Sequence, residues 1–176
     1  SRTYWGDLHS HTAFSDGRGL PAEMYDFARR VAALDFCAVT DHAFTVTDQM
    51  WEQSRETTNR LNTPGSFVTL LAYEWSGVTD VGGDHNIFTD LDDLPIIRSL
   101  SYYNYRNFRM YHGGPALLAN HIEEVFRLLN DRFDDGHVLA IPHYGGRRGN
   151  PAWPNPKIQR AIEIFSDHRR SDDRPA

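Results

Sequence analysis

Cysteine, lysine and long apolar runs are scarce in this sequence. The single cysteine, Cys37, cannot form an internal disulfide, which fits a reducing compartment without requiring one. No apolar run approaches the roughly 18 residues needed to cross a bilayer, and the formal net charge of -6 disfavours a nucleic-acid partner. We therefore expect a soluble protein with no membrane or specific nucleic-acid contacts and of open oligomeric state. Cytoplasm and periplasm both stay open as its location. The start at Ser1 fits either a removed leader or a trimmed chain, and the two cannot be separated by sequence.

The length of 176 residues predicts one domain covering 1–176. Helices are predicted to begin near Pro21 and near Pro115, each with an apolar stripe at helical spacing. The stripes comprise Met24, Phe27, Ala28 and Val31 in the first helix and Leu118, Ile122, Val125, Phe126 and Leu129 in the second. Short apolar segments predict strands at residues 3–9, 35–42, 66–75, 84–90, 137–143 and 161–165. Strands alternating with helices indicate an α/β fold with a mainly parallel sheet, and we prefer a closed barrel to an open sheet.

Histidine and carboxylate side chains recur where the predicted strands end. Singly, each has an ordinary explanation as a turn residue, a cap or a hydrogen-bonded buried group. Together they indicate a shared pocket, because functional groups of parallel α/β folds gather at the carboxyl ends of strands. Divalent cations would neutralise the carboxylates there, and the mixture of imidazole and carboxylate suits Zn, Mn or Fe, with Mg as a further option. These residues are His9, His11, Asp16, Asp41, His42, Glu74, His85 and His143.

The ordered segments "DLHSHTAFSDG", "AVTDH", "YEW", "DHN" and "IPHYGG" resemble the successive motifs of the PHP (polymerase and histidinol phosphatase) superfamily. The resemblance implies a distorted TIM-like barrel of seven strand and helix units, two or three metal ions and phosphoesterase activity. It implies the metal ligands His9, His11, Asp16, His42, Glu74, His85 and His143. Glu74 would bridge ions, and Asp7 and Asp41 would orient the ligating imidazoles. The family's late Asp-x-His motif has no counterpart before Ala176, so we expect the last strands of the barrel to be missing.

These residues predict a metal-dependent hydrolase that cleaves phosphate esters with metal-activated water and takes a small phosphorylated substrate. Glu74, His85 and Asp41 are the predicted catalytic residues. Positive groups near the mouth would stabilise charge on the phosphoryl oxygens, and the candidates for binding substrate are Arg147, Arg148 and His112. His112 belongs to residues 91–114, an aromatic and arginine-rich insertion that we interpret as a flap over the site.

Two other functions fit parts of the pattern. An amidohydrolase-type enzyme also has His-x-His at a strand end and would cleave C–N bonds. Many such enzymes bridge their metals with a carboxylated lysine, whereas the only lysine here is Lys157, in a proline-rich segment. A metal-stabilised structural or regulatory module without catalytic activity is the second alternative.

Overall fold

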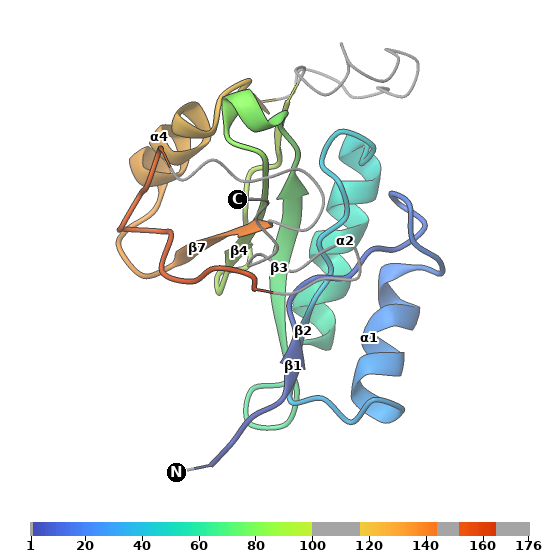
Figure 1. Ribbon diagram of the computed structural model, residues 1–176. Coiled ribbons are helices and arrows are strands. Elements are labelled where there is room, and N and C mark those ends of the chain that lie inside the picture. The colour runs from blue at the N-terminus through green and yellow to red at the C-terminus, as the bar shows by residue number, and fades with distance from the viewer. Residues whose placement is uncertain (1, 100–116, 144–151, 165–176) are drawn as a thin grey trace.

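A five-stranded mixed sheet organises the residues that this computed structural model describes, 2–99, 117–143 and 152–164 (Figure 1). Its strands, in spatial order, are β1 (Gly6–Asp7), β2 (Phe36–Ala38), β3 (Val68–Trp75), β4 (Asp84–Thr89) and β7 (Val138–His143). β1, β2 and β3 pair in parallel, whereas β4 pairs antiparallel with both β3 and β7. β7 therefore runs in the same direction as β3. The carboxyl ends of β1, β2, β3 and β7 consequently all point the same way along the sheet. β5 (Ile97–Arg98) and β6 (Leu117–Leu118) form a separate parallel pair.

The predicted barrel with a mainly parallel sheet is wrong. Two of the four pairings are antiparallel, and within the described residues β1 and β7 are the open edges of the sheet. The reason lies in residues 76–83, which join β3 to β4 through a single 3-10 turn, η1 (Thr79–Val81), and two glycines, Gly82 and Gly83, with φ of 125° and 75°. A parallel crossover needs a connection of about a dozen residues or more, so this short link returns the chain antiparallel.

Within the described residues, three helices flank the sheet, and the sequence predicted two of them. α1 (Pro21–Arg30) begins where expected but buries Pro21, Tyr25 and Ala28, while Phe27 and Val31 of the predicted stripe are 54% and 69% exposed. The stripe is therefore wrong for Phe27 and Val31 and right for Ala28 and the partly buried Met24, because the helix turns Tyr25 rather than Phe27 toward the sheet. α2 (Asp48–Leu61) was not predicted, although Thr47 caps it by accepting a hydrogen bond from the Met50 backbone N–H.

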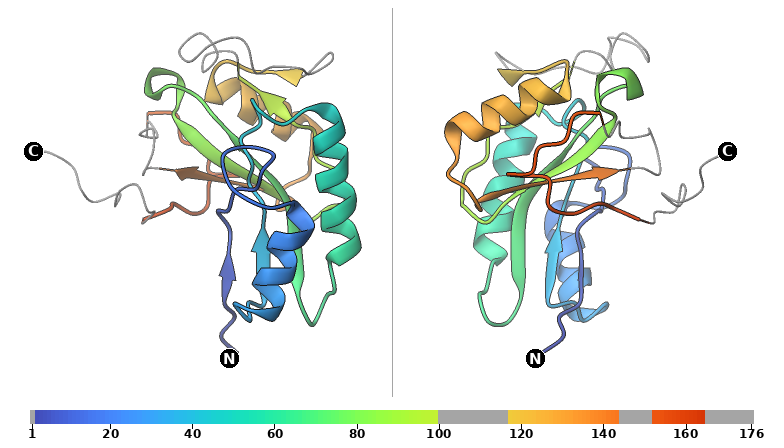
Figure 2. Two further views of the ribbon diagram at one scale, coloured as in Figure 1. Left: turned by 90° about the vertical axis from the view of Figure 1, so that its right-hand side faces the viewer. Right: turned by 60° about the vertical axis from the view of Figure 1, so that its left-hand side comes forward.

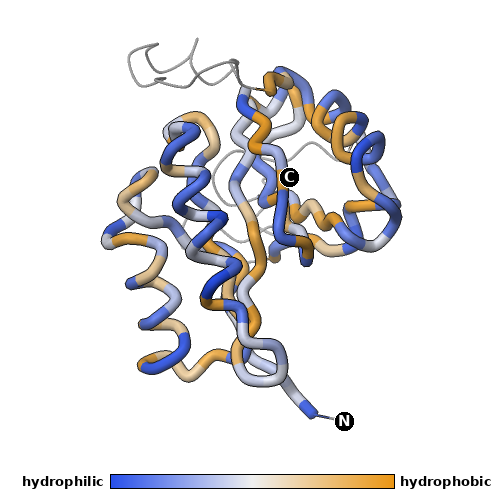
Figure 3. The backbone as a smooth tube through the Cα atoms, turned by 180° about the vertical axis from the view of Figure 1, so that it is seen from behind, coloured by the Kyte–Doolittle hydropathy of each residue, from blue (hydrophilic) through white to orange (hydrophobic). Residues whose placement is uncertain are grey.

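α4 (Ile122–Arg132) confirms its predicted apolar face. Ile122, Val125, Phe126 and Leu129 are all buried. The helix begins at Ile122 rather than near Pro115, because the His121 side chain caps it and Leu118 belongs to β6. The tube coloured by hydropathy shows the same division, with apolar colour in the central strands and alternating colours along the helices (Figure 3).

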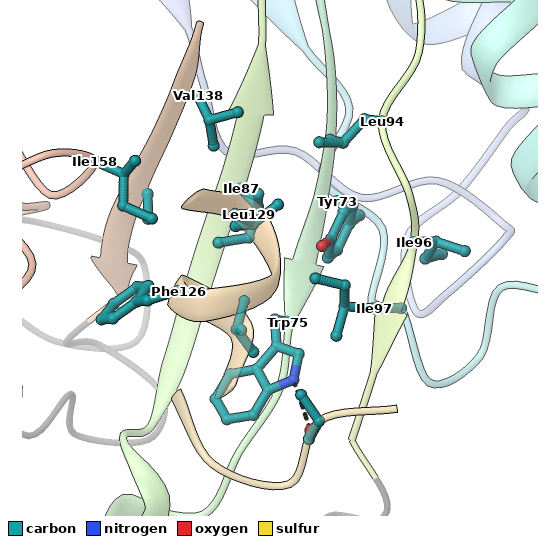
Figure 4. Packing of buried hydrophobic residues seen from close by; sticks show 14 of the residues in the cluster. Tyr73, Trp75, Ile87, Leu94, Ile96, Ile97, Phe126, Leu129, Val138 and Ile158 are labelled. Carbon is teal, nitrogen blue, oxygen red and sulfur yellow. Dashed lines mark hydrogen bonds between the residues drawn. The ribbon is translucent and has the colours of Figure 1, made fainter. Parts of the chain in front are cut away.

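The largest core lies on the face of the sheet that α4 covers. Tyr73 and Trp75 of β3 and Ile87 of β4 point to this face, where Phe126 and Leu129 of α4 pack against them (Figure 4). The Trp75 indole N–H donates to the carbonyl of Ala119 at 3.2 Å. Because side chains alternate along a strand, Glu74 of β3 and Asn86 of β4, which are paired in register, point to the opposite face.

Residues 152–164 run beside β7 (Figure 2), where the Ala140 N–H donates to the carbonyl of Ile158 at 2.7 Å. The predicted strand at 161–165 is wrong for its described part, 161–164, which is irregular, and Ile162 and Ile164 are 52% and 70% exposed. Most of the predicted flap, 100–114, lies outside the described residues. Among the described helices, none combines the length and apolar character that a membrane span requires.

Candidate metal centre

Glu74, near the end of β3, lies at the centre of a group of histidines. It is 1% exposed, and its Oε2 lies 3.2 Å from His11 Nε2, 3.5 Å from His9 Nε2 and 3.3 Å from His42 Nδ1. Neither carboxylate oxygen has a hydrogen-bond partner in the described structure. Burial alone would raise the pKa of Glu74, but the neighbouring imidazoles, His42 foremost, hold it well below its usual range. A buried carboxylate without hydrogen bonds needs a compensating positive charge.

His9 and His11 reach Glu74 from the loop that follows β1. Asp7 accepts a hydrogen bond from the His9 backbone N–H at 2.9 Å. Asp41, after β2, accepts from the Thr12 backbone N–H at 2.7 Å, from the Thr12 hydroxyl at 2.6 Å and from the Ser15 hydroxyl at 2.5 Å. Both aspartates thus contact the loop that bears the two histidines and neither contacts an imidazole directly, so the orienting role expected of Asp7 and Asp41 stays a prediction.

At Gly17 the same loop folds back against the backbone of His11. A Cβ at this position would lie 2.1 Å from the carbonyl oxygen of His11, so no larger residue fits without moving the backbone. The turn "SDG" in the sequence therefore marks the place where the loop folds back on His11.

The spacing of the imidazole nitrogens is that of metal ligands. The Nε2 atoms of His9 and His11 lie 3.2 Å apart, close to the distances that join them to Glu74. Two ligand atoms about 2.0–2.1 Å from a tetrahedral ion are separated by about 3.3 Å. Among the residues that the structure describes, three overlapping groups have ligand atoms within 4.8 Å of one another, namely His9, His11 and Glu74; His11, Asp16 and His42; and His9, His143 and Glu163.

Asp16 and His42 extend the cluster toward solvent. Asp16 Oδ1 lies 3.4 Å from His11 Nδ1, and its Oδ2 lies 3.5 Å from His42 Nε2. The Asp16 side chain is 68% exposed, and its interaction with His42 lowers the pKa of the carboxyl group. His42 Nδ1 also lies 3.0 Å from the Ser76 hydroxyl oxygen.

His143 joins the cluster at the end of β7, where its ring meets the His9 ring edge-on with 4.5 Å between centroids. Both rings contact Glu163, which sequence reasoning missed. The Glu163 Oε1 lies 2.8 Å from His9 Nδ1, and its Oε2 contacts His143 Nδ1. The only sequence signal was a lone acidic residue in the apolar segment 161–165, which gave no reason to relate it to residues so distant along the chain.

His85 does not lie with the other predicted ligands. It pairs in register with Trp75, and its ring contacts Phe126 at 5.7 Å and Trp75 at 6.4 Å between centroids, on the helix-covered face. Its Nε2 lies 3.0 Å from Gln159 Nε2. The neighbouring Asn86 shares the face of Glu74 instead, and its buried Oδ1 has no hydrogen-bond partner among the described residues. Arg147, Arg148 and His112, the predicted substrate-binding residues, lie outside the described residues.

Residues 43–149, more than half of the chain, match the family model described as "Protein of unknown function (DUF3604)". The chain belongs to the DUF3604 family. The DUF3604 match includes Glu74, Asn86 and His143, whereas His9, His11 and Glu163 lie outside it.

No curated protein matches the chain. A solved structure with some likeness is that of a "putative metal-dependent phosphoesterase" from Bifidobacterium adolescentis, at 23% sequence identity and a TM-score of 0.37. The match covers 51% of this chain and 29% of that one.

Opposite pKa shifts at two histidines predict that the metal-free DUF3604 chain is most stable near pH 6.5. Burial disfavours the charged form of His9, but its interactions with the carboxylates of Glu163 and Glu74 outweigh it and raise the pKa of His9 to about 10. The folded chain then binds the extra proton between about pH 6.5 and 10, so its free energy of unfolding falls as pH rises through that range. Burial lowers the pKa of His85 to about 4, so between pH 6.5 and 4 the free energy of unfolding falls as pH falls.

Urea unfolding of the chelator-treated chain at several pH values measures both limbs of the stability curve, the fall in the free energy of unfolding above pH 6.5 (alkaline limb) and the fall below it (acid limb). Each limb is expected to slope by about 1 kcal/mol per pH unit, since one proton is worth about 1.4 kcal/mol per unit. His9→Gln should flatten the alkaline limb only, and His85→Gln the acid limb only. A wild-type stability that rises between pH 6.5 and 8.5 would contradict the assignment of His9.

Proposed function

We propose that this chain is a metal-dependent hydrolase that cleaves phosphate esters of a small phosphorylated substrate. Its divalent ions, two or three in number, would be held by His9, His11, Asp16, His42, Glu74 and His143. The observation that carries the proposal is the single Glu74 oxygen that faces three imidazole nitrogens at 3.2–3.5 Å without a hydrogen bond. His85 is left out of this set because it lies on the other face of the sheet.

The donor set fits such ions. Imidazole suits Zn and Fe, and carboxylate suits Mn, whereas Mg prefers a shell made mostly of oxygen ligands, so Zn, Fe and Mn are the better candidates for this mixed set. The carboxylates of Glu74 and Asp16 would balance the charge of the ions, and Glu74 would be the shared ligand because one of its oxygens lies close to three imidazoles.

The side chains of this protein would hold the ions and orient the ligating groups, and the ions would supply the chemistry. When bound, a divalent ion lowers the pKa of water and offsets negative charge on a phosphoryl oxygen. Asp41 keeps His11 in place by fastening the loop at Thr12 and Ser15. Arg147, Arg148 and His112 stay the proposed contacts to the phosphate group. The ordered motifs that resemble the PHP superfamily contribute these ligands, which favours phosphate esters as substrates.

The amidohydrolase alternative lacks a suitable lysine to bridge its metal ions. Lys157 Nζ lies 3.1 Å from Asp135 Oδ1, and its side chain is 57% exposed. Lys157 is the only lysine in the sequence, so no carboxylated lysine is available to bridge ions beside Glu74.

Hydrolysis of chromogenic phosphate monoesters, phosphate diesters and amides, measured with Zn²⁺ or Mn²⁺, tests the proposal. Turnover of an ester that stops on chelation, and that Asp16→Asn lowers while Asp131→Asn leaves it unchanged, would support it. Asp131 is a suitable control because it is an exposed carboxylate on α4 that pairs with Arg127. Full metal occupancy without turnover of any ester would favour the structural or regulatory module, and turnover of amides alone would favour the other class of hydrolase.

A further inference from the structure

Glu163 links two of the clustered imidazoles from a segment far away in the sequence. Its side chain is 16% exposed, with one oxygen against His9 Nδ1 at 2.8 Å and the other against His143 Nδ1. Glu163 is therefore a carboxylate acceptor shared by two imidazole N–H groups.

We propose that Glu163 is a positioning residue that keeps the Nδ1 atoms of His9 and His143 protonated and so directs both Nε2 atoms to the metal ions. A neutral imidazole has one N–H and one lone pair. If the Nδ1–H donates to Glu163, the lone pair belongs to Nε2, and in His9 this atom faces His11 Nε2 at 3.2 Å and Glu74 at 3.5 Å. This inference rests on the metal-binding part of the proposed function.

Distances distinguish this role from direct ligation by Glu163. The separation of 2.8 Å between His9 Nδ1 and Glu163 Oε1 is a hydrogen-bond length. It is shorter than the roughly 3.3 Å between two ligands of one tetrahedral ion. The separations around Glu74, 3.2–3.5 Å, match that spacing instead. Glu163 thus lies behind the His9 imidazole, on the side away from Glu74.

His11 shares this orientation with His9, with Nε2 toward Glu74 and an oxygen at Nδ1, whereas His42 presents Nδ1 to Glu74. His11 Nδ1 lies 3.1 Å from the Ser15 hydroxyl oxygen, and Ser15 in turn donates to Asp41. His42 Nδ1 lies 3.0 Å from the Ser76 hydroxyl oxygen. His9, His11 and His143 therefore have an oxygen at Nδ1 on Glu163 or Ser15. An acceptor at one ring nitrogen is how proteins fix the tautomer of a histidine that binds metal through the other.

The glutamine variant E163Q tests this role with little change of shape. Its amide has one acceptor oxygen and one donor group, so only one of the two imidazoles can keep its Nδ1–H bond. Because outer partners of ligating histidines typically contribute 10- to 100-fold to metal affinity, we expect E163Q to lower the affinity for Zn²⁺ by about that factor. Competition with a chromogenic chelator measures the loss. E56Q, an exposed glutamate of α2, is the matched control and should bind as the wild type does.

Nitrogen-15 NMR of the Zn²⁺-loaded chain reports the tautomers directly. In the wild type we expect protonated Nδ1 and metal-bound Nε2 for both His9 and His143, and in E163Q the loss of one protected Nδ1–H signal. A metal-bound Nδ1 in either histidine, or wild-type affinity in E163Q, would overturn the proposal for Glu163. The wild-type spectrum alone decides if E163Q does not fold.

The outcomes separate this inference from the proposed reaction. Zn²⁺ binding with the expected tautomers but no ester hydrolysis would leave the role of Glu163 intact and count against the enzyme. Failure of the wild-type chain to bind Zn²⁺, Mn²⁺ or Fe²⁺ would overturn both.

Discussion

Replacement of Glu74 by glutamine is expected to lower the affinity for Zn²⁺ or Mn²⁺ by more than 100-fold and to abolish ester hydrolysis. Glutamine keeps the size of the side chain but removes the negative charge that faces His9, His11 and His42. Loss of a direct ligand should exceed the 10- to 100-fold effect of outer partners. Isothermal titration and the ester assay measure the two losses.

The glutamine variant also has a signature without metal. Glu74 helps to raise the pKa of His9, so in E74Q the pKa of His9 should fall toward its ordinary value, and the decline of stability above pH 6.5 should become weaker. Thermal unfolding checks that the variant is folded, and E56Q controls for the loss of a glutamate elsewhere. Metal affinity within threefold of the wild type in E74Q would rule out Glu74 as a ligand.

Zn²⁺ at a thousandfold excess over its dissociation constant is expected to raise the melting temperature by about 10 °C. A ligand that binds only the folded chain adds about 4 kcal/mol under those conditions, and in a chain of this size each kcal/mol is worth about 2–4 °C. The physical reason is that the proposed ions connect the loops after β1 and β2 with the ends of β3 and β7. Differential scanning fluorimetry with and without a chelator measures the shift.

The variant H9A tests whether this rise in melting temperature depends on the proposed ligands. It removes a ligand and one of the two partners of Glu163, so the rise with Zn²⁺ should largely disappear. In the wild type the rise should grow between pH 6 and 8, because ions compete with the proton that His9 holds up to about pH 10. Equal melting temperatures with saturating metal and with chelator would contradict a metal centre that contributes to stability.

Much of the cluster could be predicted from the sequence because its members follow strands. His9 and His11 follow β1, His42 follows β2, Glu74 lies near the end of β3 and His143 ends β7, and the structure brings all of them together. Parallel directions decide this, since β7 regains the direction of β3 through two antiparallel pairings. These residues therefore lie together even though the sheet is mixed rather than mainly parallel.

Local patterns in the amino-acid sequence were sufficient for most strands, for the buried face of α4 and for the convergence of imidazoles on Glu74, because burial and strand ends leave signals within a few residues. Three features depended on the folded chain. Register placed Asn86 rather than His85 on the face of Glu74, the short link at 76–83 made the sheet mixed, and Glu163 reached His9 and His143 from a distant segment. Each depends on which strands and segments become neighbours, and that is decided by packing over the whole chain rather than by the order of residues within any one segment.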